Sequence, residues 1–311
     1  MSRLPVRVTG ATTLAVFLAS CVASPVPQAN VAGPARNTEA LAGRIRERIA
    51  AVPGAVVGVA YRDLERGDTL YLNADDTFHA ASTMKVPVMI ELYRAFDAGR
   101  LRADQTIPLT NSFKSIVDGS AYSLDAGSDS DSLVYTRVGT RVTIGELIDR
   151  MIIRSSNLAT NTVIELVGAE KANATAHALG ARNIRVLRGV EDTKAFQAGL
   201  SNTTTARDLA VLMEAIQRNS AASPASSAAM REILLRQEFN SEIPAGLPPG
   251  TPVAHKTGSI TGVMHDAAIV YPAGRGPYVL VLLTRGIPQP KVAEGLMADV
   301  SRLVYQWTMT R

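Results

Sequence analysis

Apolar residues recur at helical spacing near both ends of the chain. Leu41, Ile45 and Ile49 lie four residues apart, which predicts an amphipathic helix from about residue 38 to residue 52, ended by Pro53 and Gly54. A last helix is predicted by one apolar stripe, formed by Val292, Leu296, Val300, Leu303, Val304 and Trp307. We expect both helices to pack against a core.

Strands are predicted next to both helices. Residues 55–61 and 69–72 are apolar and β-branched, and residues 65–68 between them have the composition of a hairpin turn. Residues 265–271 and 278–284 follow the same pattern around a turn-like segment at 272–276. Both ends of the chain are therefore expected to supply strands.

The middle of the chain favours helices. Start and stop signals predict helices over residues 83–98, 144–153, 157–167, 171–179 and 206–217. Two of these have capping signals, Thr143 with Glu146 and Thr205 with Asp208. Residues 113–135 are polar and irregular, which predicts a surface loop.

This order of elements predicts an α+β fold. We expect an antiparallel sheet flanked by the N- and C-terminal helices, with an all-helical lobe inserted between its strands. The folded domain would cover residues 38–311, with a sheet lobe from about 38–80 and 250–311 and a helical lobe from about 81–249. A chain of 311 residues with 46% apolar composition can bury a core of that size.

The first 20 residues have the pattern of an export signal. Arg3 and Arg7 precede an apolar run over residues 11–20, which is too short to remain in a membrane as a span. The segment Leu18-Ala19-Ser20-Cys21 resembles the bacterial lipobox, in which the cysteine becomes the lipidated first residue of the mature protein. Cys21 is the only cysteine in the chain, and cleavage near Ala29 without lipidation is the alternative.

Residues 21–37 are expected to form a flexible tether, because they are rich in proline and glycine and poor in large apolar residues. With the export signal, this predicts a protein of the bacterial periplasm or cell envelope. Lipidation of Cys21 would attach it to a membrane.

Composition excludes several classes of site. One cysteine allows no internal disulfide, and the four histidines include no i,i+4 pair suited to zinc, so we expect no metal and no cofactor. The net charge of +4, from 32 basic and 28 acidic residues, contains no block of like charges, so nucleic acid is not indicated. We expect a monomer that acts on a small molecule.

Ser82 and Lys85 are the first candidate for catalysis. They stand three residues apart at the start of a predicted helix, so they share a face and the amine can approach the hydroxyl. A serine becomes a good nucleophile only when a base takes its proton, and a partly buried lysine of lowered pKa can do so. Alone, this pattern is also typical of a helix cap followed by a solvated lysine.

Two further segments strengthen this interpretation. Ser155-Ser156-Asn157 begins a predicted helix, and His255-Lys256-Thr257-Gly258 leads into the C-terminal strands. Each is common by itself as a cap or a turn. Together, S-x-x-K, S-x-N and K-T-G in this order resemble the class A β-lactamases and the penicillin-binding proteins, from about residue 40 to the end of the chain.

The resemblance implies an acyl-transfer reaction. By it, Ser82 is the acylated nucleophile, Lys85 handles its proton, and Ser155 relays a proton to the departing ring nitrogen. The backbone N–H groups of Ser82 and Ser259 would form the oxyanion hole.

The resemblance also implies how a substrate is held. Asn157 would bind the substrate side-chain amide, and Lys256 would place positive charge near the substrate carboxylate. Thr257, Gly258 and Ser259 would complete the binding strand, with the two hydroxyl groups donating hydrogen bonds to that carboxylate.

Two departures from the family pattern affect this expectation. Class A enzymes resemble one another in a loop with a Glu, followed by Leu-Asn, that positions the deacylating water. Glu191 stands at about the corresponding place, but no Leu-Asn follows it, and its neighbour Asp192 is the alternative base. The strand after Lys256 contains Met264-His265-Asp266 and offers no obvious arginine for the substrate carboxylate.

The sequence therefore favours a serine β-lactamase and leaves two alternatives open. One is a D-alanyl-D-alanine peptidase or esterase-like serine hydrolase of the same fold, which would bind peptidoglycan-like substrates. The other is a non-catalytic envelope lipoprotein that binds cell-wall fragments. The complete set of Ser82, Lys85, Ser155 and Lys256 argues against the second, because a binder does not need a proton relay. An unrelated α/β-hydrolase is disfavoured, because the sequence contains no G-x-S-x-G elbow.

Overall fold

The computed structural model describes residues 1–2, 4–5 and 36–310. The chain divides into two units, Met1–Val31 and Ala32–Arg311, and the fold described below is that of the second. The apolar run of the predicted export signal and the lipid attachment predicted at Cys21 lie outside the described residues.

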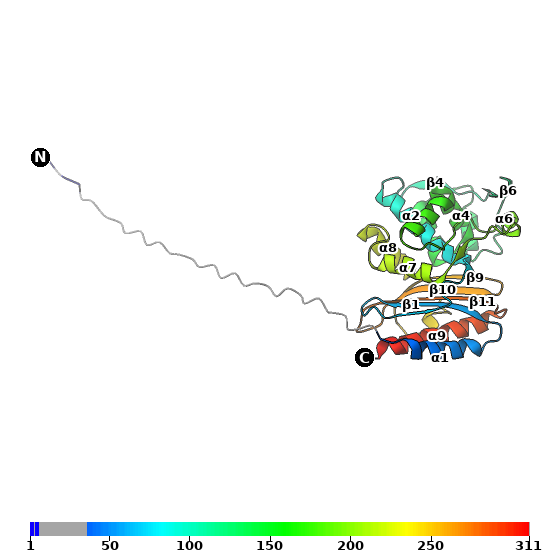
Figure 1. Ribbon diagram of the computed structural model, residues 1–311. Helices are drawn as coiled ribbons and strands as arrows, with labels where there is room; N and C mark the ends of the chain where they lie inside the picture. Colours follow the sequence, from blue (N-terminus) through cyan, green and yellow to red (C-terminus); the bar gives the residue numbers. More distant parts are fainter. Residues whose placement is uncertain (3, 6–35, 311) are drawn as a thin grey trace. The chain divides into compact units, whose positions relative to one another are not determined.

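One five-stranded sheet is built from both ends of the chain (Figure 1). Its order is β2 (Thr69–Leu72), β1 (Val56–Asp63), β11 (Tyr278–Arg285), β10 (Val263–Val270) and β9 (Val253–Ile260). All neighbours are antiparallel. Strands β1 and β11 pair in the centre, from Val56 opposite Arg285 to Asp63 opposite Tyr278. The α+β fold with an antiparallel sheet is confirmed.

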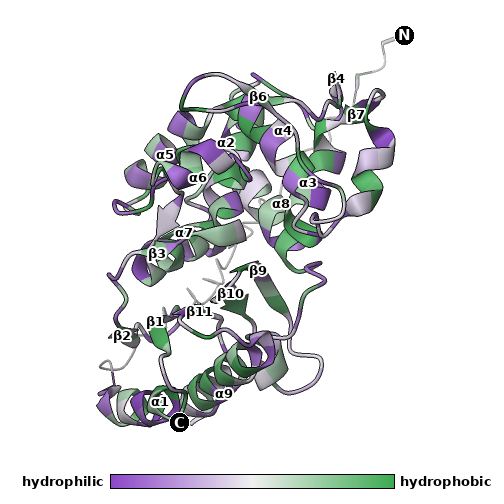
Figure 2. Ribbon diagram, turned by 90° about the vertical axis from the view of Figure 1, so that its right-hand side faces the viewer, coloured by the Kyte–Doolittle hydropathy of each residue, from purple (hydrophilic) through white to green (hydrophobic). Residues whose placement is uncertain are grey.

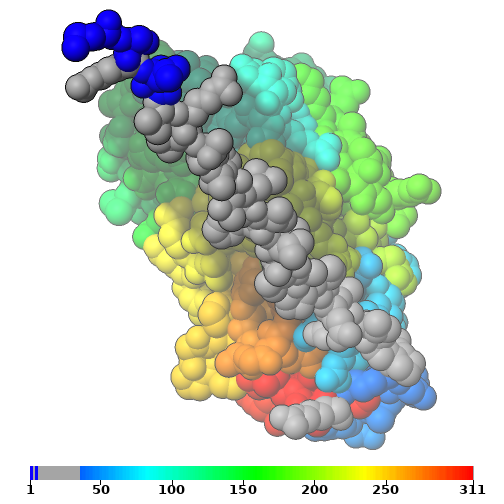
Figure 3. Space-filling view, turned by 90° about the vertical axis from the view of Figure 1, so that its left-hand side faces the viewer, coloured from blue at the N-terminus to red at the C-terminus, as the bar shows by residue number. Residues whose placement is uncertain are grey.

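Helices α1 (Glu39–Ala50) and α9 (Pro290–Met309) cover one face of this sheet and lie side by side (Figures 1 and 3). Leu41 and Ile45 of α1 and Val300 of α9 are buried in one apolar cluster with side chains from alternate strand positions. The predicted apolar stripe is confirmed at Leu296, Val300 and Val304, whereas Val292 is 41% exposed.

The other face of the sheet packs against the helical part of the chain. Helix α7 (Ala206–Gln217) contacts β1, β10 and β11, and α2 (Lys85–Asp97) is buried from Lys85 to Tyr93. Four helices contact α2: α3 (Ile144–Ile153), α4 (Asn157–Val167), α5 (Ala169–Ala178) and α8 (Pro224–Leu234). A short helix, α6 (Thr193–Gln197), belongs to the same part of the chain. Apolar positions on several of these helices turn toward the interior of this layer (Figure 2).

Several short elements complete the fold. Three two-stranded ladders pair β3 (Phe78–His79) with β8 (Thr203–Thr204), β4 (Thr106–Pro108) with β7 (Arg141–Thr143), and β5 (Phe113–Lys114) with β6 (Ala121–Tyr122). Three 3-10 helices, η1 (Ala81–Met84), η2 (Ser132–Arg137) and η3 (Pro244–Gly246), join larger elements. The predicted helix over 83–98 therefore begins as the tighter turn η1.

The surface loop predicted over residues 113–135 is wrong in one respect. Besides β5, β6 and the start of η2, the segment contains two buried carboxylates, Asp129 and Asp131, which are 7% and 1% exposed. Both have charged or backbone partners on α3 and α4. A polar composition predicts solvent exposure only where the fold supplies no such partners.

Both capping signals form their N-caps. Thr143 Oγ1 accepts the Glu146 N–H at 3.1 Å, and Thr205 Oγ1 accepts the Asp208 N–H at 3.1 Å. The acidic side chains have other partners: Glu146 pairs with Arg150, and Asp208 accepts the Asn183 N–H. At both helix starts the threonine hydroxyl is therefore the side-chain group that caps the first turn.

Neither membrane spans nor metal clusters occur in the described part of the chain. None of its helices has the length and apolar character needed to cross a bilayer. Within residues 36–310, no three histidine, cysteine or acidic side chains are grouped so that they could hold a metal ion.

Candidate active site

Ser82 lies in η1, between the sheet and the helical part of the chain. Strand β9 passes so close to η1 that a Cβ on Gly258 would lie 2.8 Å from the Ser82 nitrogen and 2.9 Å from the Thr83 nitrogen. Only glycine permits this approach without a shift of the backbone. Ser82 therefore faces the edge strand of the sheet, and it lines a cavity of about 670 Å³ that follows β9.

Lys85 is the first residue of α2 and is fully buried. Its Nζ donates to the Ser155 carbonyl oxygen at 2.5 Å, to Ser155 Oγ at 3.2 Å and to Asn157 Oδ1 at 3.0 Å. The described residues show no hydrogen bond between Lys85 and Ser82. The structure therefore ties this lysine directly to the start of α4.

Lys256 on β9 is also fully buried and approaches Ser155 from the other side. Its Nζ donates to Ser155 Oγ at 3.0 Å and to the Thr257 carbonyl oxygen at 2.8 Å. Ser155 Oγ thus accepts a hydrogen bond from each lysine, and its own hydroxyl hydrogen stays available for a third partner. A proton can pass between Ser155 and either amine.

Burial lowers the basicity of both lysines, and the charge of Lys256 lowers that of Lys85 further. Burial, and then the positive charge of Lys256, hold the pKa of Lys85 well below its usual value, while Asp129 and Glu191 oppose this shift. Burial lowers the pKa of Lys256 to about 7, against the opposing charges of Asp266 and Glu242. At neutral pH an amine that can accept a proton is therefore present in the cluster.

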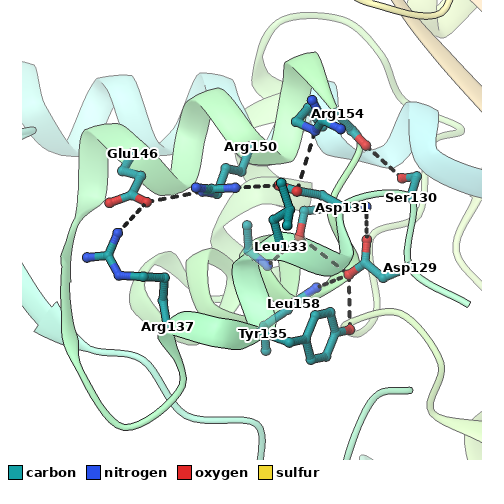
Figure 4. Close-up of polar contacts among 12 residues, drawn as sticks. Asp129, Ser130, Asp131, Leu133, Tyr135, Arg137, Glu146, Arg150, Arg154 and Leu158 are labelled. Carbon is teal, nitrogen blue, oxygen red and sulfur yellow. Dashed lines mark hydrogen bonds and ion pairs between the residues drawn. The ribbon is translucent and has the colours of Figure 1, made fainter. Parts of the chain in front are cut away.

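The start of α4 is held by a carboxylate from the 113–135 segment. Asp129 Oδ2 accepts the backbone N–H of Asn157 at 2.8 Å and of Leu158 at 3.0 Å, and the Tyr135 hydroxyl donates to it at 3.0 Å (Figure 4). These N–H groups have no partner within the helix, and the helix dipole favours a negative charge there. Asp129 therefore fixes the turn that carries Ser155 and Asn157.

A second carboxylate joins this segment to α3. Asp131 pairs with Arg150 at 2.8 Å, and Arg150 also contacts Glu146, which in turn pairs with Arg137 (Figure 4). Asp131 is buried, so these charge-assisted contacts are shielded from solvent. The network keeps the Asp129 carboxylate in place.

Sequence reasoning missed Asp129. The sequence gives no sign that Asp129 lies close to Ser155, because 26 residues separate the two in the chain. The polar run around Asp129 instead favours a surface loop.

Glu191 projects from a segment whose neighbouring residues are both anchored. Asn161 Oδ1 accepts the Val190 N–H at 2.6 Å, and Asn161 Nδ2 donates to the Val190 carbonyl at 3.1 Å. On the other side, Asp192 caps α6. The side chain of Glu191 is exposed, and its Oε1 accepts a hydrogen bond from Asn157 Nδ2 at 2.7 Å.

Asp192, the alternative base, has its carboxylate occupied by structural contacts. It accepts the Ser115 hydroxyl at 2.9 Å and the N–H groups of Ile116 and Ala195 at 3.0 Å each. These hydrogen bonds lower the pKa of this nearly buried carboxyl group, against the opposing effect of its burial. The geometry therefore favours Glu191, whose side chain is exposed, over Asp192 as the carboxylate available to activate a water molecule.

Glu191 also belongs to a wall beside Ser82. A second cavity of about 530 Å³ is lined by both residues, together with Asn157 and Ser259.

Three of the five non-glycine residues with positive φ in the described part of the chain are Ala81, Ser155 and Glu191. Such backbone strain persists where the surroundings enforce it and is frequent at functional sites.

The binding residues expected on β9 line the first cavity with Ser82 and Ser155. They are Thr257, Gly258 and Ser259. Among the described residues, no lysine or arginine lines this cavity, and its only charged lining residues are Glu242 and Glu294. His265 is directed elsewhere, because its Nε2 contacts the His79 carbonyl at 2.8 Å. The absence of an arginine noted in the sequence thus holds for the described cavity wall.

The chain is similar to known proteins both in sequence and in structure. A family profile described as the β-lactamase enzyme family matches residues 40–308. The β-lactamase AST-1 of Nocardia asteroides is 30% identical over 256 residues, covering 81% of this chain and 78% of that protein. The solved structure of PBP-A superposes with a TM-score of 0.76 at 28% identity and covers 89% of this chain and 98% of that one. An ancestral class A β-lactamase superposes with a TM-score of 0.75 at 25% identity, covering 86% and 99%.

Proposed function

The chain belongs to the β-lactamase enzyme family, and we propose that it is a class A-like serine β-lactamase that opens the β-lactam ring through an acyl-enzyme ester on Ser82. The observation that carries the proposal is the position of Ser155 Oγ. It lies within hydrogen-bond distance of two buried lysine amines, on the same cavity wall as Ser82.

Acylation uses the two serines and Lys85. The Ser82 oxygen attacks the β-lactam carbonyl carbon, and its proton passes to the neutral amine of Lys85. As the ring C–N bond breaks, Ser155 gives its hydroxyl proton to the departing nitrogen and recovers one from Lys85. The short contacts of Ser155 to both lysines support this relay.

The developing negative charge on the carbonyl oxygen needs backbone donors. Gly258 brings β9 against the Ser82 nitrogen, and Ser259 follows on the same strand. The N–H groups of Ser82 and Ser259 are the proposed oxyanion hole, an arrangement that commonly lowers the barrier by about 3–4 kcal/mol per donor.

Deacylation uses Glu191. Its carboxylate takes a proton from a water molecule, the oxygen of that water attacks the ester carbonyl, and the Ser82 oxygen leaves and is protonated again. Asn157 supports this role because it contacts Lys85 through Oδ1 and Glu191 through Nδ2. One amide side chain thereby links the acylation and deacylation groups.

Turnover of a chromogenic cephalosporin, combined with the intact mass of the protein, tests this function. Rapid hydrolysis that Ser82→Ala abolishes supports the lactamase. A stable adduct on Ser82 without turnover would contradict it and favour the peptidase. The absence of both adduct and turnover would favour a binding protein.

We propose from the sequence alone that the protein is exported to the cell envelope, attached through a lipidated Cys21, and monomeric. The support is the basic and apolar pattern of residues 1–20 and the lipobox-like segment around the single cysteine. Cys21→Ala should move the protein from the membrane fraction to the soluble fraction. Unchanged membrane attachment would contradict lipidation.

A further inference from the structure

Glu242 lies on the wall of the cavity that contains Ser82, in the segment between α8 and η3. It is only 7% exposed, and its Oε2 is buried without any hydrogen-bond partner among the described residues. A buried carboxyl oxygen without a partner is costly in a folded protein. The proposed relay does not use it.

Hydrogen bonds and strand pairing connect Glu242 to the substrate-binding strand. The N–H of the next residue, Ile243, donates to Asp266 Oδ2 at 3.2 Å. Asp266 on β10 stands directly opposite Thr257 on β9, so their side chains share one face of the sheet. Glu242 therefore lies on the side of the cavity that Thr257 and Ser259 line.

The charged groups around Glu242 come from three elements. Strand β10 contributes Asp266, which also contacts His255 Nδ1 on β9 at 3.0 Å. Strand β9 contributes Lys256, whose ammonium donates to Ser155 and to the Thr257 carbonyl. Helix α9 contributes Glu294, which pairs with Lys291 at 2.7 Å. Lys256 and Lys291 thus have partners other than Glu242. The carboxylates of Asp266 and Glu294 repel a negative charge on Glu242.

Burial, and then the negative charges of Asp266 and Glu294, raise the pKa of Glu242 to about 8. Below that pH the side chain carries a proton and is a neutral carboxylic acid. A protonated carboxyl group can donate a hydrogen bond, which a carboxylate cannot do.

The same part of the cavity must receive the carboxylate of a β-lactam, if the proposed function holds. No lysine or arginine lines the described cavity wall, so direct hydrogen bonds to the anion have to come from neutral donors, while the buried amine of Lys256, which donates to the Thr257 carbonyl, can add positive charge nearby. Resting on the proposed function, we propose that Glu242 determines specificity by donating a hydrogen bond from its carboxyl group to the substrate carboxylate, beside Thr257 and Ser259.

Binding measured in the Ser82→Ala background tests this role without turnover. The probes are a cephalosporin and its methyl ester, which lacks the anionic carboxylate, titrated calorimetrically at pH 7 and pH 9. Because the donor form of Glu242 is lost above pH 8, affinity for the acid should fall about tenfold more than affinity for the ester.

Three further variants in this background complete the test. Glu242→Gln keeps an N–H donor, so the acid should still bind at pH 9. The affinity that this variant does lose between pH 7 and pH 9 should be the part caused by deprotonation of Lys256, whose pKa is about 7. Glu242→Ala should weaken binding of the acid at pH 7 about tenfold and binding of the ester by less than twofold. Glu238→Gln, at an exposed acid of the same segment that pairs with Arg154 and does not line the cavity, is the control and should leave the preference for acid or ester at pH 7 unchanged.

Three outcomes would overturn the inference: no measurable binding of the acid at pH 7, equal responses of acid and ester, or the same pH dependence in Glu242→Gln as in its parent. Failure of the proposed function gives a different result. The protein with Ser82 intact would then hydrolyse neither compound, while the comparison of acid and ester would still decide the role of Glu242.

Discussion

Asn157 Nδ2 donates a hydrogen bond to Glu191 Oε1 at 2.7 Å. The Oδ1 of the same amide accepts a hydrogen bond from Lys85 at 3.0 Å. A side chain that the family resemblance assigns to substrate binding thus also orients the carboxylate proposed to activate water. The predictions below begin with that carboxylate.

Glu191→Gln should separate acylation from deacylation. The amide cannot take a proton from water, so steady-state turnover should fall by about a hundredfold or more while the acyl-enzyme still forms. Intact-mass spectra should show the adduct on Ser82 accumulating within the first turnovers. Asp118→Asn, an exposed acid that pairs with Lys194 nearby, is the control and should leave turnover unchanged. Normal turnover in Glu191→Gln would show that another group activates the water.

Asp129→Ala should change both stability and the pH profile of acylation. It removes the acceptor of two N–H groups at the start of α4, at a cost of about 1–2 kcal/mol. It also removes a negative charge that raises the pKa of Lys85, so more of this amine is neutral at low pH. The acidic limb of kcat/KM should therefore move to lower pH.

Asp131→Ala is the matched control for Asp129. Asp131 is also buried and holds the same segment through Arg150, but it is not among the charges that shift the pKa of Lys85. It should lower the melting temperature without moving the acidic limb. Equal shifts of that limb in both variants would contradict an electrostatic role for Asp129.

Lys256→Ala should move the acidic limb of kcat/KM in the direction opposite to Asp129→Ala. Its positive charge helps to lower the pKa of Lys85, so its removal makes Lys85 harder to deprotonate. The acidic limb of kcat/KM should move to higher pH, and KM for anionic substrates should rise. A pH–rate profile with one substrate measures both effects, and a limb that stays in place would show that the two amines are not coupled.

Gly258→Ala should damage the site through the backbone. The added Cβ would lie 2.8 Å from the Ser82 nitrogen, so β9 or η1 must shift, at a cost of about 1–3 kcal/mol. Displacing an oxyanion donor should lower the acylation rate by about a hundredfold. Gly43→Ala on α1, where no atom lies within 4 Å, is the control and should stabilise the protein slightly. An acylation rate unchanged in Gly258→Ala would contradict the proposed oxyanion hole.

Local patterns predicted the sheet and its covering helices, whereas the grouping of Ser82, Lys85, Ser155 and Lys256 was implied by the family resemblance that short motifs carried. They succeeded because strand alternation, helical spacing and short motifs at the starts of elements are encoded by neighbouring residues. The side chain of Lys85 shows the limit. Its position three residues from Ser82 predicted a contact within one helix, whereas its amine contacts Ser155, which lies 70 residues away just before α4.

Two acids near the site could not be found in that way. Asp129 is buried because α4 presents free N–H groups to it, and Glu242 lies in the cavity because the segment after α8 packs against Asp266 on β10. Neither belongs to a periodic pattern or a motif. Helix α8 is different, since Ser223 and Pro224 are a start signal that was present in the sequence and not used.

The most direct test of the account is the fate of the ester on Ser82. The purified protein is mixed with an excess of a chromogenic cephalosporin, and absorbance and intact mass are followed together, with Ser82→Ala alongside. The account predicts many turnovers, little adduct at steady state, and neither hydrolysis nor adduct in Ser82→Ala. One equivalent of lasting adduct with no further hydrolysis, or hydrolysis that survives in Ser82→Ala, would contradict it.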